Sequence, residues 1–376
     1  MDYEDTTLML AGPVKIHPRV LKVMSTPSIG HRTSHFREVC LEIRDLLRYA
    51  FDTEGAVAVI SGSGTAGLEA MLCSTLRVDD RVLCITNGKF GERMYEIASL
   101  YSQADQLDFP WGKAMNLQVL KERLDADAYR AVTLCHNETS TAATNLASEV
   151  GKLARRDGLL YLVDGITSVG GLPVEMEAWG IDGIVLGSQK CLAAPAGLSA
   201  VALSERGYEV LRDGTPYYLD LKAHVDRLEK GDTPYTPAIH LLLAFREALR
   251  MLREEGLRSR IERTALLGRA CREAGRAIGL SLYPDLECAS DTLSAFWYPD
   301  GVKDEQFRPR LRDEHRVMVA GGQGSIRGRV FRIGHMGVCS LSDLLVTFAA
   351  VEAVLDKIGH PVQKGASLEA ISRLVV

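Results

Sequence analysis

Regular alternation of apolar runs and amphipathic stretches is the feature that most constrains the fold. Runs of aliphatic and β-branched residues, each followed by a turn and a helical pattern, span residues 56–60, 81–86, 131–136, 159–165, 183–188 and 198–204. Apolar runs without polar alternation are typical of parallel strands that are buried on both faces, with helices as the crossovers. The sequence therefore predicts an α/β fold around a mostly parallel sheet.

The pattern changes after Pro237, where two long helical stretches over residues 238–255 and 257–278 begin. Shorter strand candidates follow, and then an amphipathic helix from Ser342. A chain of 376 residues is long enough for two domains at about 150 residues each. We expect an N-terminal arm over residues 1–15, a large domain over 16–255 and a smaller α+β C-terminal domain over 256–376.

Composition excludes several classes of protein. With 46% hydrophobic and 25% charged residues the chain is neither disordered nor fibrous, and a net charge of −5 gives no reason to expect nucleic acid or an anionic membrane as a partner. The apolar run 344–355 is too short to cross a bilayer, and the acidic first ten residues do not resemble a signal peptide. The eight cysteines show no metal-ligand spacing. We expect a soluble cytoplasmic protein with free thiols and no metal site.

A glycine motif predicts a phosphate site. Gly62, Gly64 and Gly67 follow a predicted strand and open a helix, which matches the pattern GxGxxG. The backbone amides from Ser63 to Thr65 would then lie at a helix N-terminus, where free donors and the helix dipole favour a phosphate. A dinucleotide site would also need an acidic residue at the end of the next strand, and Thr-Asn-Gly stands there. A phosphate outside a dinucleotide is therefore favoured, and a tight turn without a ligand is the alternative.

Two charged residues indicate which phosphate compound could bind. Asp164 ends one predicted strand, and Lys190 follows the next strand along the chain. Open α/β sheets bind ligands at the carboxyl ends of their strands. A lysine can form a Schiff base with an aldehyde, and a carboxylate can keep a pyridine nitrogen protonated, so the pair favours pyridoxal phosphate. Taken singly, the two residues would be a solvated lysine and a helix cap.

Several longer segments resemble the class V aminotransferases, which are fold-type I pyridoxal-phosphate enzymes. The resemblance runs from AGPVKIHPRVL to VFRIGHMG and includes SGSGTAGLEAML, NGKFGERM, HNETSTA, VDGITSVGG, GSQKCLAAPAG and TPYTPAI. It is nearest to alanine–glyoxylate and serine–glyoxylate aminotransferases. It implies a large domain with a mostly parallel seven-stranded sheet, a smaller C-terminal domain, a cofactor of pyridoxal 5'-phosphate and a homodimer with shared active sites.

The resemblance also implies a role for individual residues. Lys190 would be the Schiff-base lysine and the base that moves the substrate proton, and Asp164 would pair with the pyridine nitrogen. Arg332 in VFRIGHMG would bind the substrate's α-carboxylate. The other positions that match family residues are Phe90 (stacking on the ring), Thr139 (meeting the ring oxygen), Ser63, Gly64, Thr65 and Gln189 (holding the phosphate), Thr236 (reaching the phosphate of the neighbouring subunit) and Gly12 (lying over the substrate).

The substrate stays open at this level. Alanine or serine as donor and glyoxylate or pyruvate as acceptor fit the resemblance best, whereas aspartate, phosphoserine or 2-aminoethylphosphonate would need a second cation. Lys15, His31 and Arg32 are candidates for that cation, although each is more typical of a solvated surface. Sulfur-removing class V enzymes need a reactive cysteine on a mobile loop, and none is evident. A non-catalytic binding module would have lost Lys190, Asp164 or Arg332, and all three are present.

Overall fold

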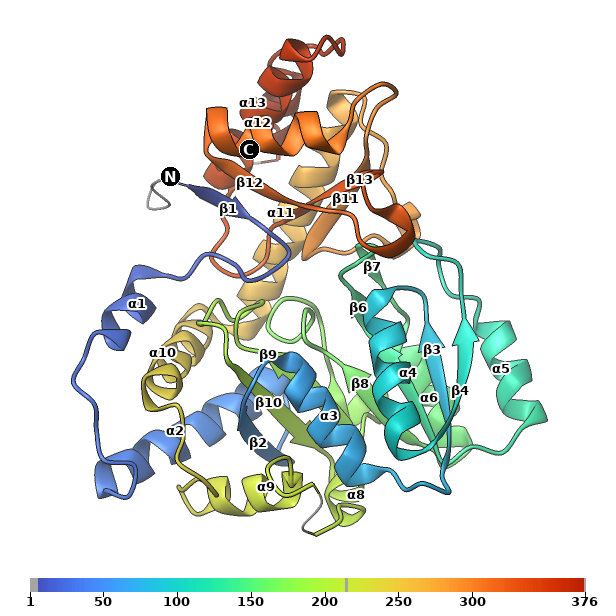
Figure 1. Ribbon diagram of the computed structural model, residues 1–376, viewed down its shortest axis with the longest axis vertical. Helices are drawn as coiled ribbons and strands as arrows, with labels where there is room; N and C mark the ends of the chain where they lie inside the picture. The colour runs from blue at the N-terminus through green and yellow to red at the C-terminus, as the bar shows by residue number, and fades with distance from the viewer. Residues whose placement is uncertain (1–5, 214–215, 375–376) are drawn as a thin grey trace.

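Seven strands form the central sheet of the protein in the computed structural model, which describes residues 6–213 and 216–374 (Figure 1). Six of the strands coincide with the predicted apolar runs, and the fold is the expected α/β arrangement with a mostly parallel sheet. In spatial order the strands are β2 (Ala56–Ser61), β10 (Leu198–Leu203), β9 (Gly183–Gly187), β8 (Leu160–Asp164), β5 (Ala131–Cys135), β3 (Arg81–Thr86) and β4 (Gln103–Asp108).

Strand β10 runs antiparallel to both of its neighbours, whereas the strands from β9 to β4 are all parallel. Strand β4 is the one that the apolar pattern does not predict. It lies at the edge of the sheet and reads QADQLD, with no buried residue. An edge strand has one neighbour and partly solvated faces, so it does not require an apolar run.

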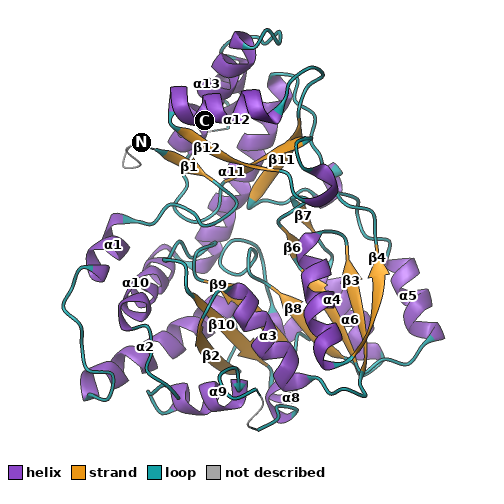
Figure 2. Ribbon diagram, in the orientation of Figure 1, coloured by secondary structure: helices purple, strands orange, loops and turns teal. Residues whose placement is uncertain are grey.

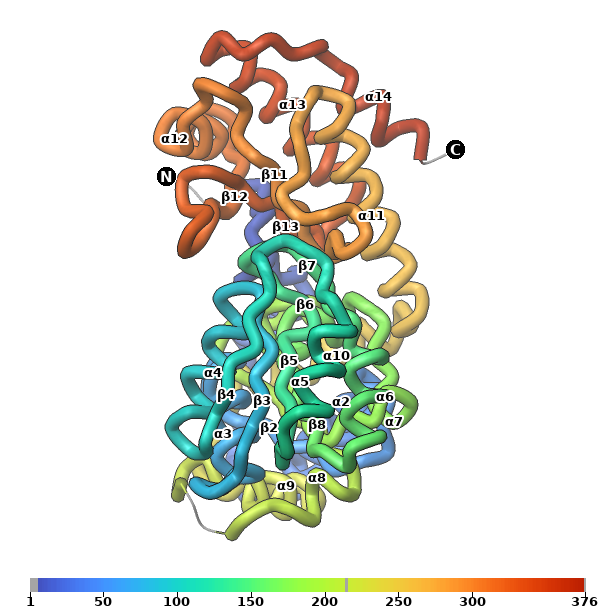
Figure 3. Tube along the Cα trace, turned by 90° about the vertical axis from the view of Figure 1, so that its right-hand side faces the viewer, coloured from blue at the N-terminus to red at the C-terminus, as the bar shows by residue number. Residues whose placement is uncertain are grey.

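Helices cover both faces of the sheet. Apolar side chains of α2, α5, α6 and α10 form one core with the strands, and those of α3, α4 and α9 form a second core on the opposite face. Figure 3 shows the α3 and α4 layer and the α5 and α6 layer on either side of the strands. The helices of this part are α1 (Pro18–Met24), α2 (Ser34–Phe51), α3 (Gly64–Thr75), α4 (Lys89–Tyr101), α5 (Leu117–Ala126), α6 (Ala147–Arg156), α7 (Met176–Trp179), α8 (Glu205–Glu209), α9 (Leu221–Glu229) and α10 (Ile239–Glu255).

A second, four-stranded sheet lies above the first in the view of Figure 2. Its strands, in spatial order, are β1 (Thr7–Met9), β12 (Val317–Gly321), β13 (Val330–Gly334) and β11 (Leu293–Trp297). It shares a core with α11 (Leu257–Ala277), α12 (Asp304–His315), α13 (Leu341–Lys357) and α14 (Ala366–Ser372). Strand β1 pairs in parallel with β12, so the predicted N-terminal arm contributes a strand to the C-terminal sheet. The domain limits themselves stay a prediction.

Two arginines of α11 connect the two parts near the ends of the central strands. Arg260 and Arg263 both pair with Glu255 at the end of α10, at 2.5 and 2.7 Å. Arg260 also donates to the carbonyl of Cys191, and Arg263 donates to that of Gly337, at 3.1 and 2.9 Å. The network therefore links the turn after β9 to the loop after β13.

Within the described residues, no helix is both long and apolar enough to span a bilayer. The eight cysteines are free thiols, of which seven are buried and Cys339 is half-buried.

Candidate active site

The structure places the predicted lysine and aspartate side by side at the carboxyl ends of two central strands. Strands β8 and β9 are parallel neighbours; Asp164 ends β8, and Lys190 follows β9 after a short turn. The Lys190 Nζ atom donates to the carbonyl oxygen of Ala11 at 2.7 Å. At Gly12, where φ is +106°, a Cβ atom would lie 2.5 Å from Nζ, so a side chain there would collide with the lysine. The N-terminal segment thus crosses directly over Lys190.

Burial shifts both groups toward neutrality. Desolvation lowers the pKa of Lys190 to about 8, and the nearby Asp164 opposes that shift. Desolvation likewise raises the pKa of Asp164 to about 7, although its carboxylate accepts a hydrogen bond from the Ile166 amide at 2.8 Å. A buried carboxylate of this kind gains most from a bound cation or a protonated donor. An amine that loses its proton near neutral pH and a buried carboxylate beside it are what an aldehyde with a basic ring nitrogen requires.

The start of α3 has the properties of a phosphate cup. Ser63 is the N-cap residue, and its side chain makes no capping hydrogen bond. The first amides of a helix have no intrahelical acceptor, so those at Gly64 and Thr65 are available to a ligand. In the part of the chain that the structure describes, the Gln189 Oε1 atom is buried without a hydrogen-bond partner; because this oxygen is an acceptor, Gln189 would contact a phosphate through its side-chain NH2 group. These residues fit the phosphate group of pyridoxal phosphate.

Phe90 is positioned by a buried carboxylate that the sequence did not single out. Glu138, which has no exposed surface, accepts hydrogen bonds from the amides of Phe90 and Gly91 at 3.0 and 2.9 Å. Its other oxygen accepts from the amide and hydroxyl of Ser140, at 3.0 and 2.5 Å. The carboxylate therefore satisfies orphan donors in the first turn of α4 and complements the helix dipole. Glu138 lies within HNETSTA, so the motif was recognised while this contact was not.

Thr139 belongs to a buried hydroxyl network beside Glu138. Its Oγ1 atom shares a hydrogen bond of 2.9 Å with Thr167 Oγ1, which donates to the carbonyl of Asn137. The Asn137 amide donates in turn to Thr167 Oγ1, at 2.9 Å, and to Thr292 Oγ1, at 2.8 Å. The network fixes the loop that carries Thr139 against the turn after Asp164.

Arg332 lies on β13 and reaches across to this loop. Its Nη1 atom donates to the Thr139 carbonyl at 2.7 Å, and its Nε atom donates to the Gly321 carbonyl at 2.9 Å. Burial lowers its pKa to about 10, which leaves the group positively charged at neutral pH. A guanidinium has five N–H donors, so donors remain for a carboxylate. Two further arginines, Arg327 and Arg329, precede β13, and the Arg329 guanidinium lies over the Trp297 ring, with its Cζ atom 5.0 Å from the ring centroid.

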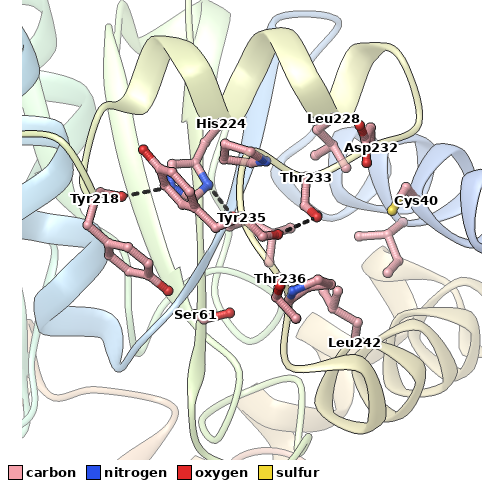
Figure 4. Close-up of a pocket in the computed structure, with 14 residues that line it drawn as sticks. Cys40, Ser61, Tyr218, His224, Leu228, Asp232, Thr233, Tyr235, Thr236 and Leu242 are labelled. Carbon is pink, nitrogen blue, oxygen red and sulfur yellow. Dashed lines mark hydrogen bonds between the residues drawn. The ribbon is translucent and has the colours of Figure 1, made fainter. Parts of the chain in front are cut away.

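Thr236 lines a pocket whose described residues include none of the other predicted cofactor residues. Figure 4 shows it between β2 and the start of α10, with Ser61, Tyr218, His224 and Tyr235 around the same space. Among the described residues that line this pocket, none is another of the predicted cofactor ligands. Tyr218 and Tyr235 are stacked at 5.2 Å between ring centroids.

The three candidates for a second substrate anion do not form a cluster of free cations. Arg32 is ion-paired with Asp232 and also donates to the Thr233 carbonyl at 3.1 Å. Lys15 is exposed and His31 is half-buried.

Comparison with known proteins decides the family. The sequence profile of the Aminotransferase class-V family matches residues 22–342. The chain belongs to this family. It is 40% identical to an uncharacterised aminotransferase of Methanocaldococcus jannaschii, over 95% of this chain and 94% of the relative. It is 32% identical to a serine–glyoxylate aminotransferase of Arabidopsis thaliana, with 97% and 94% covered.

The fold comparison agrees. The crystal structure of ureidoglycine–glyoxylate aminotransferase from Bacillus subtilis superposes with a TM-score of 0.94 at 32% identity and covers 98% of both chains. This class V aminotransferase therefore has the fold-type I architecture that the resemblance implied, and pyridoxal phosphate is the cofactor that its family implies.

Proposed function

We propose that this class V aminotransferase uses pyridoxal 5'-phosphate to transfer the amino group of alanine or serine to a small 2-oxo acid, glyoxylate or pyruvate. The observation that carries the proposal is the pair formed by the desolvated Lys190 amine and the buried Asp164 carboxylate at neighbouring strand ends. The serine–glyoxylate and ureidoglycine–glyoxylate relatives support glyoxylate as the acceptor.

When bound, the cofactor supplies an aldehyde and an electron-withdrawing ring, which stabilises negative charge at the substrate's α-carbon. The cup at Ser63, Gly64, Thr65 and Gln189 would hold its phosphate. Phe90 would lie against its ring, and Thr139 would face the hydroxyl oxygen attached to the ring. Asp164 would accept a hydrogen bond from the ring nitrogen and so keep the ring cationic. Each of these roles is part of the proposal.

Lys190 and Arg332 would act on the substrate. Lys190 Nζ would hold the cofactor's aldehyde carbon and, once released, would carry the proton that leaves the α-carbon. A lysine whose pKa is near 8 can both accept and return that proton near neutral pH. The remaining Arg332 donors would bind the α-carboxylate through parallel hydrogen bonds, which orients the bond to the departing proton. Gly12 would leave room above Lys190.

The ion pair that Arg32 forms favours a substrate without a second anionic group. The charge of Arg32 is already neutralised by Asp232, so aspartate, phosphoserine or 2-aminoethylphosphonate would have to displace that carboxylate.

A non-catalytic binding module would have no use for a desolvated lysine beside a buried aspartate.

The proposed assembly is a homodimer, in which Thr236 of one subunit reaches the cofactor phosphate of the other. The support is that Thr236 lines a pocket whose described residues include none of the other predicted cofactor ligands of the same subunit. Analytical ultracentrifugation tests this proposal, because a monomer that retains full activity would contradict it.

Absorption spectroscopy tests the activity. Protein loaded with pyridoxal phosphate is expected to show a visible band that disappears with alanine or serine and returns on addition of glyoxylate or pyruvate. Aspartate, phosphoserine and 2-aminoethylphosphonate are expected to change the band much more slowly. A band that responds only to these anionic amino acids would reverse the proposed specificity, and a protein that gains no band would refute the cofactor.

A further inference from the structure

One cation beside the phosphate cup has no assigned role. Arg93 lies on α4, one turn after Phe90, and its Cζ atom lies 4.9 Å from the centre of the Phe90 ring. Its Nη1 atom donates to the Thr65 hydroxyl at 3.2 Å. The guanidinium therefore touches both the residue expected to meet the cofactor ring and a residue expected to hold the phosphate.

Arg93 is also without an acidic partner. Among the ion pairs of residues 6–213 and 216–374, none includes Arg93, whereas Lys89 on the same helix pairs with Glu92 at 2.6 Å. Its positive charge acts weakly on the site: it opposes the burial that raises the pKa of Asp164 and adds to the burial that lowers the pKa of Lys190. An arginine that has no acidic partner and lies beside a predicted phosphate site is typical of an anion site.

The proposed cup needs such a charge. Ser63, Gly64, Thr65, Gln189 and Thr236 offer only neutral donors, whereas a phosphate monoester carries about −1.5 to −2 charges at pH 7. Neutral donors can satisfy the phosphate oxygens but leave most of that charge uncompensated. A guanidinium binds phosphate oxygens through charge-assisted, paired hydrogen bonds.

We infer that Arg93 is the cation that neutralises the cofactor phosphate, with its guanidinium supported by the Phe90 ring and the Thr65 hydroxyl. The inference rests on the proposed function. It also assigns Phe90 a second role, because the same ring would position both the cofactor and the arginine.

A comparison of two ligands tests the inference independently of catalysis. Pyridoxal 5'-phosphate and pyridoxal differ only in the phosphate, and both can react with Lys190. Their dissociation constants would be measured by absorbance titration of cofactor-stripped protein for the parent chain, Arg93→Gln, Arg93→Lys and Lys89→Gln. Lys89→Gln is the matched control, because it removes one positive charge from the start of the same helix.

Arg93→Gln is expected to weaken binding of the phosphate ester about ten- to hundredfold, the usual range for a charge-assisted hydrogen bond, and to change pyridoxal binding less than about twofold. Arg93→Lys should recover part of the loss, and Lys89→Gln should change neither ligand. Equal losses for both ligands would reduce Arg93 to a packing role and overturn the inference.

Inorganic phosphate provides a second readout. It should compete with pyridoxal phosphate for the parent chain, and its inhibition constant should rise at least about tenfold in Arg93→Gln. An unchanged inhibition constant would overturn the inference while the visible band of the parent chain still supports the proposed function. If the parent chain itself gains no band with pyridoxal phosphate, the proposed function and the inference both fail.

Discussion

Replacing Lys190 with alanine is expected to abolish transamination while the protein still binds pyridoxal phosphate. The variant loses the amine that would hold the aldehyde carbon and move the α-proton, and general acid–base catalysis alone contributes about 10²–10⁴-fold. We expect activity to fall by at least about a thousandfold. Steady-state assays and absorbance titration would measure both effects. Lys113→Ala, which removes an exposed lysine paired with Asp285, is the control and should keep full activity.

The reduced pKa of Lys190 adds a pH dependence to this prediction. With a pKa of about 8, roughly one tenth of the amine is neutral at pH 7, compared with about 0.03% at the ordinary lysine value of 10.5. Only the neutral amine reacts with an aldehyde. The rate of cofactor uptake should therefore rise between pH 6 and 8 and level off above about pH 9.

Asp164, with a pKa of about 7, titrates in the same range. Recording the same profile in Asp164→Asn separates the two groups. A rate that continues to rise up to pH 10.5 would show that Lys190 is not desolvated, and substantial transamination by Lys190→Ala would refute its catalytic role.

Asp164→Asn is expected to lower the turnover number by about two to three orders of magnitude, the usual effect of removing a preorganised electrostatic group. Asparagine keeps the shape of the side chain but carries no charge, so it cannot hold the ring nitrogen protonated. The absorption maximum of the bound cofactor should shift at the same time, because the ring loses its proton. Stopped-flow measurements of the reaction with alanine or serine would check the rate.

Asp182→Asn is the matched control for this substitution. Asp182 is equally buried but lies before β9, at the opposite end of the strands, where it accepts from the Tyr161 amide at 2.8 Å and pairs with Arg206. The control should lower the free energy of unfolding by about 1–3 kcal/mol and leave the cofactor spectrum unchanged. If both variants lose activity in proportion to their loss of stability, Asp164 has a structural role only.

Local sequence patterns were sufficient for the elements that carry the site. Strands β8 and β9 are buried on both faces, so their apolar runs marked them clearly, and the polar residues at their ends stood out against those runs. The start of α3 was equally visible, because a glycine-rich turn between a strand and a helix is typical of a phosphate-binding loop. Assigning the roles of Lys190, Asp164 and Arg332 took the resemblance to a family, since each residue type is common on protein surfaces.

Contacts between segments that are distant in the sequence were not visible in this way. The sequence showed that Glu138 belongs to a recognisable motif, but only the folded chain shows its carboxylate capping α4 through the Phe90 amide. Arg93 has an ordinary place on an amphipathic helix, and its importance arises from contacts with Thr65 and Phe90.

The sequence by itself determined the α/β class and six of the seven central strands, because burial on both faces and helix periodicity produce patterns in consecutive residues. Through the family resemblance it also indicated the residues expected to perform the chemistry. The tertiary structure alone decided that polar β4 completes the sheet, that β1 joins β12 and that the Ala11 carbonyl meets Lys190. An edge strand, a short strand added from a distant terminus and a backbone contact across the site leave no apolar or periodic pattern, since their stability comes from partners far away along the chain.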